Sequence, residues 1–136
     1  MKFVIYGEPK GKGRPRFRNA GKFITTYTPK ETADYETLVR FSFMQQVLDA
    51  YVIQGEVKAT IKSYFPIPKS TSKKKKLYMI NGCIRPVKKP DTDNIAKIIL
   101  DSLNAIAYRD DSQVVELKVE KHYSESPRVE VEITEI

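Results

Sequence analysis

The sequence predicts an α+β fold in which a single domain, residues 1–136, builds a mixed β-sheet with two main helices packed on it. A chain of 136 residues with 40% hydrophobic residues suits one packed core. Short segments of β-rich or alternating composition are interrupted by two long segments with helical spacing. Their order is strand, hairpin, helix, strand, helix, strand, strand, which indicates a sheet with helices packed on it.

The first elements are extended. Residues 2–6, KFVIY, predict a short strand, and the following stretch to residue 17 is a loop with three glycines and two prolines. Residues 16–27, RFRNAGKFITTY, predict a β-hairpin that turns at Asn19, Ala20 and Gly21.

Residues 28–51 predict the first long helix. Thr28 is its expected N-cap, Pro29 suits the first turn, and Glu31 has the capping-box spacing from Thr28. Four apolar residues fall near helical spacing: Leu38, Phe41, Met44 (or the neighbouring Gln45) and Leu48.

The remaining elements alternate between strand and helix. Residues 56–67 predict a strand with Val57, Ala59 and Ile61 on one face, and residues 69–90 a long basic loop that is functional or partly disordered. Residues 93–108 predict the second helix. Residues 111–123 and 127–136 predict two strands in a hairpin. Their expected core-facing side chains are Val115, Leu117, Val119, Val129, Val131 and Ile133.

The net charge of +7 is concentrated in two stretches. Residues 1–30 and residues 68–97 each sum to +7, whereas residues 31–67 sum to −2 and residues 98–136 to −5. Such a surplus points to anionic partners. The one cysteine excludes an internal disulfide and indicates a reduced, cytoplasmic compartment, and no apolar run is long enough for a secretory signal or a membrane span.

Two carboxylates, Asp91 and Asp93, lie inside the second basic stretch. One of them is explained by capping of the helix that follows, because Asp is a common N-cap and acidic residues favour the positive end of the helix dipole. Only one residue can be the cap, however. On the helix, a polar stripe of side chains four apart would then consist of Asp93, Lys97, Asp101, Asn104 and Tyr108. The buried side would consist of Ile95, Ile99, Leu103 and Ile106.

Paired carboxylates beside a lysine also suit hydrolysis of a phosphodiester. Carboxylates can hold Mg²⁺, the cation can activate water, and an ammonium can stabilise developing negative charge. Asp110 and Asp111 offer a further ligand, although Asp-Asp-Ser is also a good turn. A helix over residues 93–108 would separate its ends by about 1.5 Å per residue, or roughly 22 Å. Periodicity does not decide whether the chain returns early enough to close this distance.

Residues 89–114 resemble the signature of the RusA family of Holliday junction resolvases, endodeoxyribonucleases often found on prophages. The family pattern is Asp-x-Asp-Asn-x-x-Lys, an Asp four residues later, a hydrophobic stretch, and Asp-Asp-x-Gln-Val. Every element is present: Asp91, Asp93, Asn94, Lys97, Asp101, Asp110, Asp111, Gln113 and Val114. The stretches YGEPKGKGRPRF and YTPKETADYE are similar to the phage-type branch, so the resemblance spans nearly the whole chain.

The resemblance implies a homodimeric, Mg²⁺-dependent nuclease, with Mn²⁺ as a substitute, that nicks two strands of a four-way DNA junction symmetrically during recombination and repair. It implies no small-molecule cofactor. Asp91, Asp93 and Asp111 match metal-binding catalytic positions, Lys97 matches the essential lysine, and Asn94 matches a residue linked to DNA handling. The segment between Asp101 and Asp110 is one residue shorter than in the best-known member, which leaves Asp110 open as the alternative to Asp111.

The basic segments are expected to bind the DNA backbone, with a solvated hairpin as the alternative for the first of them. The expected DNA-binding residues, besides Asn94, are Lys10, Lys12, Arg14, Arg16, Lys88 and Lys89.

The remaining conspicuous residues receive simpler interpretations. The Lys73–Lys76 run is expected to be flexible and to touch DNA loosely. Core packing is expected for Phe17, Phe23 and Tyr27 rather than stacking on bases. His122 has no second histidine at ligand spacing, so zinc is not expected, and Cys83 receives no role.

Two rival functions remain open. In a basic nucleic-acid-binding module, Asp91 and Asp93 would only cap a helix. In a related metallonuclease, the substrate would be a flap or RNA.

Overall fold

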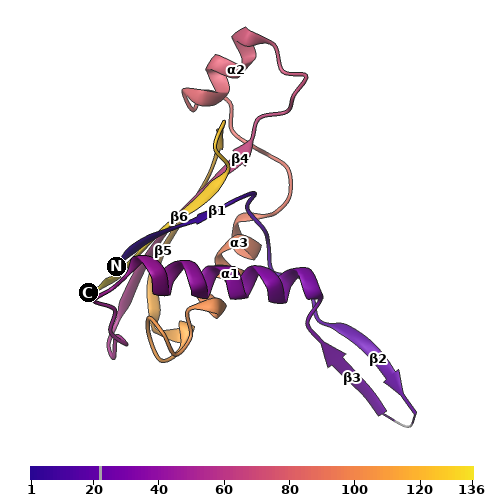
Figure 1. Ribbon diagram of the computed structural model, residues 1–136, viewed down its shortest axis with the longest axis vertical. Coiled ribbons are helices and arrows are strands. Elements are labelled where there is room, and N and C mark those ends of the chain that lie inside the picture. The colour runs from indigo at the N-terminus through magenta and orange to yellow at the C-terminus, as the bar shows by residue number, and fades with distance from the viewer. Residues whose placement is uncertain (22) are drawn as a thin grey trace.

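A mixed sheet of four strands, in the order β1-β6-β4-β5, forms the body of the computed structural model (Figure 1). The structure describes residues 1–21 and 23–136. The strands span Lys2–Tyr6 (β1), Val57–Pro66 (β4), Val114–Ser124 (β5) and Arg128–Glu135 (β6). Strand β6 is antiparallel to both of its neighbours, and β5 is parallel to β4. The predicted α+β class, with one mixed sheet in a single domain, is confirmed.

The two C-terminal strands do not form the predicted hairpin. Although only three residues separate β5 from β6, β4 lies between them and pairs with both. This makes β5 an edge strand. Of the side chains expected to face the core, Val129, Val131 and Ile133 on β6 are buried, whereas Val115 and Leu117 on β5 are 60% and 48% exposed. The prediction was wrong for these two because an edge strand has a neighbour on one side only.

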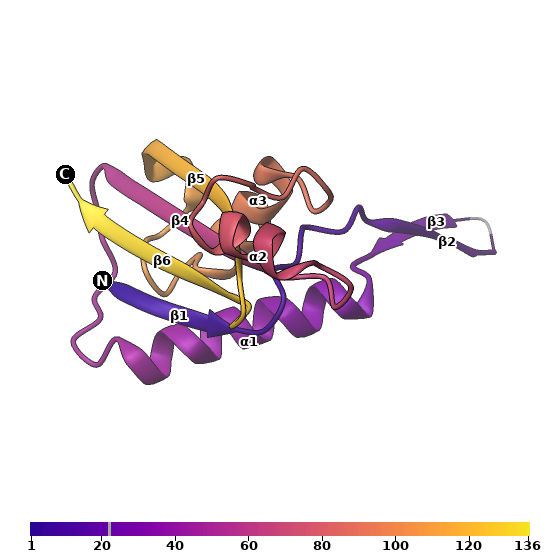
Figure 2. The same ribbon diagram turned by 90° about the horizontal axis from the view of Figure 1, so that it is seen from above.

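Helix α1, Lys30–Gln46, is shorter than the predicted 28–51. It begins after Pro29, and no side chain caps it, so the expected Thr28 cap does not form. The helix runs alongside β1 (Figure 2). Its buried positions are Thr32, Tyr35, Val39, Ser42 and Phe43. The four apolar residues at helical spacing in the sequence are all exposed: Leu38, Phe41, Met44 and Leu48.

Gln46, the last residue of α1, contacts the free edge of the sheet. Its side-chain Oε1 accepts a hydrogen bond from the Val4 N–H at 2.8 Å, and its Nε2 donates to the Val4 carbonyl at 2.7 Å. These two bonds satisfy the backbone N–H and carbonyl of Val4 on the side of β1 that has no partner strand.

Helix α3, Thr92–Ser102, ends well before the predicted residue 108. At its end the Leu103 N–H bonds to Leu100, and Ala105 adopts a left-handed φ of 69° that reverses the chain. The buried Tyr108 hydroxyl donates to the Leu100 carbonyl at 2.6 Å, so the returning chain is tied to the helix end. Tyr108 was expected on the polar stripe, and instead it is fully buried.

Residues 69–90, expected as a loop, contain a further helix, α2, at Lys73–Ile80. The Ser72 hydroxyl caps it by accepting from the Lys75 N–H, and Met79 is its buried residue. The Lys73–Lys76 run therefore forms the first turn of a helix. Helix α2 lies at the end of the molecule opposite the hairpin of β2 (Arg16–Ala20) and β3 (Phe23–Tyr27) (Figure 1).

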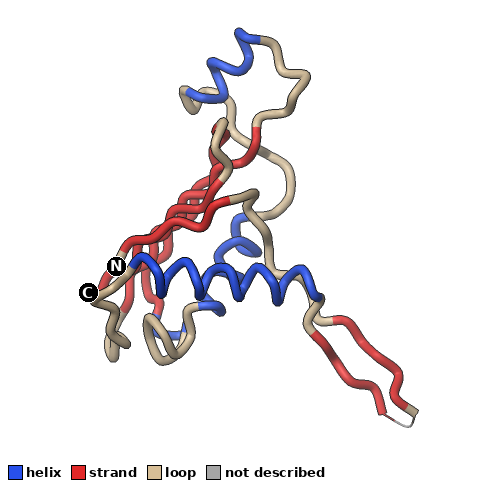
Figure 3. The backbone as a smooth tube through the Cα atoms, in the orientation of Figure 1, coloured by secondary structure: helices blue, strands red, loops and turns tan. Residues whose placement is uncertain are grey.

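The predicted hairpin is present as β2, Arg16–Ala20, and β3, Phe23–Tyr27, which project from the body as an isolated arm (Figure 3). Phe17 is 75% exposed on this arm, so it does not pack in the core as expected. The side chains of Phe23 and Tyr27 fall outside the described set. Among the described helices, none has the length and apolar character that crossing a membrane requires.

The core lies between the sheet and helices α1 and α3. It joins alternate residues of β4 and β6 to Phe3 and Ile5 of β1 and to the apolar side of α3. Phe3 and Phe43 pack edge to face at 5.4 Å between ring centroids. The core therefore fixes α3, and with it the carboxylates at its start and end, against the sheet.

Candidate active site

Lys97, Asp101 and Asp111 converge beside helix α3. The Lys97 Nζ lies 3.1 Å from Oδ1 of Asp101, one turn along the helix, and 3.7 Å from Oδ2 of Asp111. Asp111 begins a short 3-10 helix, η1, at Asp111–Gln113, directly before β5. Because α3 ends at Ser102 and the chain reverses there, the 22 Å separation expected for a helix up to residue 108 does not arise.

The neighbouring charges shift the pKa values of Lys97 and Asp111. The pKa of Lys97 is raised, first by its hydrogen bond to Asp101, so Lys97 stays cationic at neutral pH. The pKa of Asp111 is raised by partial burial and by the neighbouring Asp101 carboxyl. Two adjacent carboxylates repel each other, and the Lys97 ammonium offsets part of that repulsion.

Gln113 holds the 3-10 helix in place. Its side-chain oxygen accepts from the N–H groups of Arg109 and Asp110 at 2.8 and 3.0 Å. Its side-chain nitrogen donates to the carbonyls of Ile53 and Gly55, both at 2.9 Å. With its amide fully bonded, Gln113 has a positioning role that the sequence motif alone did not reveal.

Asp110 and Asp111 have different surroundings. The Asp110 carboxylate accepts a hydrogen bond from the Ser112 N–H at 3.0 Å and caps η1. Its pKa is lowered, chiefly by its interaction with Ser112. Asp111 points instead to Lys97 and Asp101. The turn interpretation therefore accounts for Asp110 and leaves Asp111 available for chemistry.

Asp91 and Asp93 lie at the opposite end of α3. Asp91 occupies the N-cap position, yet its side chain makes no cap hydrogen bond, and Asp93 is in the first turn. Both are exposed. The capping explanation offered for one of them therefore fails for Asp91, because its carboxylate is not used by the helix.

The donor chemistry of these aspartates fits a hard divalent cation, since all offer carboxylate oxygens. Within residues 1–21 and 23–136, however, no three Asp, Glu, His or Cys side chains are grouped closely enough to enclose an ion. The structure brings Asp111 to Lys97 and Asp101, and it does not bring Asp91 or Asp93 into that cluster.

Basic side chains meet Asp91 in a groove of about 700 Å³ between the glycine-rich loop and the start of α3. Lys10, Arg14 and Lys89 line it together with Asp91 and Asn94. These are residues that the sequence assigned to DNA and to the metal. Two basic stretches that are far apart in the sequence thus share one surface.

The other expected DNA-binding residues have different positions. Lys88 is exposed, and its carbonyl accepts a hydrogen bond from the Lys121 ammonium. The side chain of Arg16 falls outside the described set. Lys12 lines the groove, but its ammonium lies between Glu36 and Asp101, at 3.1 and 3.5 Å. Lys12 was predicted to contact DNA, and in the structure its ammonium is paired with two acids.

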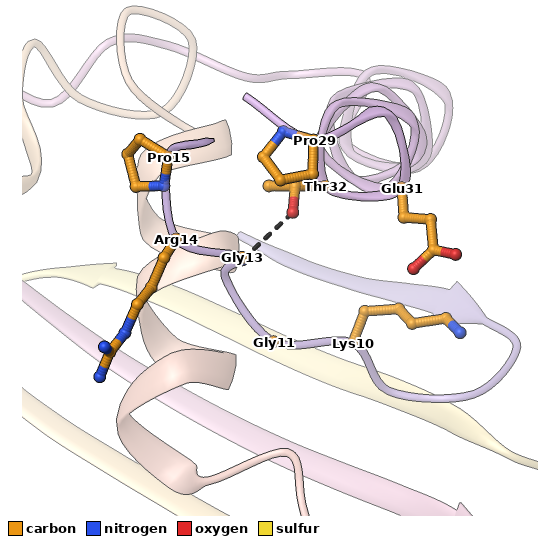
Figure 4. A pocket seen from close by; sticks show the side chains of 8 residues that line it. All are labelled: Lys10, Gly11, Gly13, Arg14, Pro15, Pro29, Glu31 and Thr32. Atoms are coloured by element: carbon orange, nitrogen blue, oxygen red, sulfur yellow. Dashed lines mark hydrogen bonds between the residues drawn. The ribbon is translucent and has the colours of Figure 1, made fainter. Parts of the chain in front are cut away.

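The glycine-rich loop is also fixed to α1 (Figure 4). The Gly13 N–H donates to the Thr32 hydroxyl at 3.1 Å. A pocket of about 370 Å³ lies beside this contact, with Lys10 and Arg14 among its lining residues. Both basic side chains thus extend from a loop whose backbone is fixed to the body.

Comparison with known proteins places this arrangement in a family. The family described as "Endodeoxyribonuclease RusA" matches residues 6–134. The chain belongs to the RusA family. Membership implies an endodeoxyribonuclease and confirms the resemblance found in the sequence. The match includes the glycine-rich loop, α3 and η1, so every candidate site residue lies inside it.

Two relatives are similar to this chain, and the second of them has a RusA name. "Uncharacterized protein YqaN" of Bacillus subtilis (strain 168) is 44% identical over 138 residues, which cover 100% of this chain and 96% of that protein. "Crossover junction endodeoxyribonuclease rusA" of Lactococcus phage r1t is 43% identical over 49 residues, or 35% of this chain and 37% of that protein.

Glu36, which pairs with Lys12, was not among the residues singled out from the sequence. Glu36 is on α1, far from the motif in the chain, and no local pattern distinguishes it from other surface acids. Only the packing of α1 against α3 brings it to Lys12 and Asp101.

Proposed function

We propose that this RusA-family chain is a Mg²⁺-dependent endodeoxyribonuclease that resolves four-way DNA junctions. As a homodimer, it would make paired, symmetric nicks during recombination and repair. The observation that carries the proposal is the convergence of Lys97, Asp101 and Asp111, because Lys12 links this cluster to the basic groove. Lys10, Arg14 and Lys89 line that groove. A groove with this charge attracts a DNA backbone. A carboxylate such as Asp91 would repel phosphate, so a site that only binds DNA has no need of it.

Asp91, Asp93 and Asp111 are the proposed ligands because they match the metal-binding positions of the RusA family. The described structure does not group them, so holding an ion would require these carboxylates to move together. When bound, the ion would polarise the scissile phosphate and lower the pKa of the attacking water. Lys97 contributes a fixed positive charge. Its pKa is raised by Asp101, so it keeps its proton at neutral pH and is unsuited to act as a general base. Its side chain is 57% exposed, which leaves the ammonium accessible to a phosphate whose negative charge grows in the transition state.

The groove residues position the substrate. Lys10, Arg14 and Lys89 would contact phosphates on one strand, and Asn94 offers an amide at the same surface. Contacts of this kind fix the register of DNA without reading its sequence. They suit an enzyme that recognises the shape of its substrate.

The alternative of a basic binding module is disfavoured by Asp91. A structural aspartate at this position would be expected to cap α3, and its side chain makes no such bond. A nuclease acting on flaps or RNA remains a rival that only substrate competition separates.

The decisive test is cleavage of a synthetic four-way junction with each strand labelled in turn. We expect cuts at symmetric positions in two strands with Mg²⁺ or Mn²⁺, and none with EDTA. A linear duplex, a flap and a duplex RNA of matched sequence serve as competitors, and light scattering gives the oligomeric state. Equal cleavage of all substrates, or cleavage in EDTA, would contradict the proposal.

A further inference from the structure

The Lys12 ammonium is enclosed by acidic side chains. Its Nζ lies 3.1 Å from Oε2 of Glu36 on α1 and 3.5 Å from Oδ2 of Asp101 on α3. The three side chains are only 23%, 14% and 18% exposed. Charges removed from water to this extent interact more strongly than surface ion pairs, because little solvent screens them.

The backbone around Lys12 is fixed on both sides. The Lys12 N–H donates to the Asn94 carbonyl at 2.9 Å, and the next N–H, of Gly13, bonds to Thr32. A Cβ on Gly11 would lie 2.9 Å from the Cβ of Pro90 and 3.0 Å from that of Asn94. The glycine permits the loop to lie directly against the start of α3, so Lys12 has little freedom to turn toward solvent.

Asp101 divides its two oxygens between two lysines. Its Oδ2 contacts Lys12, and its Oδ1 contacts Lys97 at 3.1 Å. The Lys97 side chain is more exposed than that of Asp101, and its contact with Asp111 is longer, at 3.7 Å. The orientation of the Asp101 carboxylate therefore determines where the Lys97 ammonium is held.

We propose that Lys12 is a positioning residue: by bridging Glu36 and Asp101, it fixes the carboxylate that holds Lys97 beside Asp111. This inference rests on the proposed nuclease function. In this proposal Lys12 supports the cleavage site and does not contact DNA. Glu36 supports the same site through its ion pair with Lys12.

The alternative, a direct phosphate contact by Lys12, has a different signature. A lysine that neutralises a phosphate contributes about one unit to the salt dependence of binding. Lys12 already has two carboxylate partners, so it has little charge left for DNA. Lys10, two residues away, is exposed in the same groove and supplies the comparison.

The test compares Lys12→Met, Lys12→Arg and Lys10→Met. Single-turnover cleavage of a four-way junction at saturating protein and Mg²⁺ is measured per folded molecule, and binding is measured without Mg²⁺ at several salt concentrations. We expect Lys12→Met to cleave about 10–100-fold more slowly, as when a supporting partner of a site is lost. Its affinity and salt slope should equal those of the wild type. Lys12→Arg should recover most of the rate, because a guanidinium can still bridge two carboxylates.

Lys10→Met should show the opposite pattern, with weaker binding and a smaller salt slope. If Lys12→Met shows that pattern too, Lys12 is a DNA contact and the proposal is wrong. It is also wrong if Lys12→Met cleaves at the wild-type rate, or if Lys12→Arg cleaves as slowly as Lys12→Met.

Glu36→Gln keeps the proposal testable if Lys12→Met does not fold. This change should slow cleavage several-fold without weakening binding, since an acidic residue cannot be an attractive contact to phosphate. A wild-type rate for Glu36→Gln would exclude the bridge.

A double-mutant cycle of melting temperatures tests the ion pair between Lys12 and Glu36 without any DNA. The double variant of Lys12→Met and Glu36→Gln should lose less than the sum of the single losses, because the two side chains share one interaction. Strict additivity would overturn the bridge. If the wild-type chain cuts no junction, the proposed function fails, and this cycle still decides whether Lys12 and Glu36 act together.

Discussion

The Lys97 ammonium and the Asp111 carboxylate lie 3.7 Å apart, although one is on α3 and the other on the 3-10 helix that follows it. The contact depends on two features of the connecting segment: the early end of α3 at Ser102 and the bond from the Tyr108 hydroxyl to Leu100. The reversal of the chain between the two halves of the RusA motif therefore brings Lys97 and Asp111 together.

Replacement of Asp111 by Asn should reduce single-turnover cleavage of a four-way junction by several orders of magnitude, because it removes a proposed metal ligand next to Lys97. The matched change is Asp110→Asn, which affects a turn cap and should cost about 10–100-fold at most. A reversal of this ranking would place the catalytic aspartate at position 110. If both variants stay active, the third ligand should be sought first at Asp101.

Asp93→Asn should abolish cleavage and leave junction binding intact, because the basic groove keeps its charge while a proposed metal ligand loses its own. Binding is measured by gel shift in EDTA, and folding by circular dichroism. Asp34→Asn, an exposed site on α1, is the control and should behave as wild type. Loss of folding together with binding in Asp93→Asn would indicate a structural aspartate.

Arg14→Gln and Lys89→Gln should each weaken junction binding and lower the log–log salt slope by about one unit, because each removes one phosphate contact. Arg16→Gln is predicted from the sequence to do the same. Lys2→Gln, on β1 at a 77% exposed position, changes the net charge equally and should leave the slope unchanged. A slope that is insensitive to Arg14 and Lys89 would show that DNA does not use the groove.

Gly11→Ala should destabilise the fold by about 1–3 kcal/mol, because the new Cβ would overlap atoms of Pro90 and Asn94. Gly55→Ala is matched to it, since the nearest atom to its new Cβ would be 4.0 Å away. Its effect should stay within about 0.5 kcal/mol. Urea unfolding measures both. Equal stability of the two variants would show that the glycine-rich loop does not need its close contact with α3.

Tyr108→Phe should reduce the free energy of unfolding by about 1–2 kcal/mol, because the buried hydroxyl loses its bond to the Leu100 carbonyl. Tyr6→Phe, at a 68% exposed position on β1, should have little effect. Chemical denaturation compares the two. An unchanged stability in Tyr108→Phe would mean that this bond does not hold the turn that carries Asp111.

Much of the sheet could be predicted from the sequence, because alternation in β4 and β6 directly reports which face is buried. Val57, Ala59 and Ile61 are all fully buried as expected. Strand neighbours could not be predicted in the same way. The three residues between β5 and β6 allow a hairpin, and only long-range pairing shows that β4 separates the two strands.

The choice of which α1 residues face the core also depends on tertiary structure. Both Leu38–Phe41 and Val39–Phe43 fit a helical repeat, and packing against β1 and α3 selects the second set. The candidate site, too, could be only partly predicted without the packing of the helices. Motif residues such as Lys97, Asp101 and Asp111 were identifiable from the sequence, whereas Glu36 became recognisable only once α1 was placed beside α3.

The two hydrogen bonds between Gln46 and Val4 have a consequence for how these molecules can associate. An open strand edge can recruit strands from other chains and so begin aggregation. On the β1 side, a glutamine from the protein's own helix occupies the backbone groups that a foreign strand would need. The β5 side has no such cover along Val115–Lys118 among the described residues, and there the charges of Glu116 and Lys118 are the safeguard. Addition of a foreign strand is therefore opposed in different ways at the two edges of the sheet: by a glutamine at β1, and at β5 by two side chains of opposite charge.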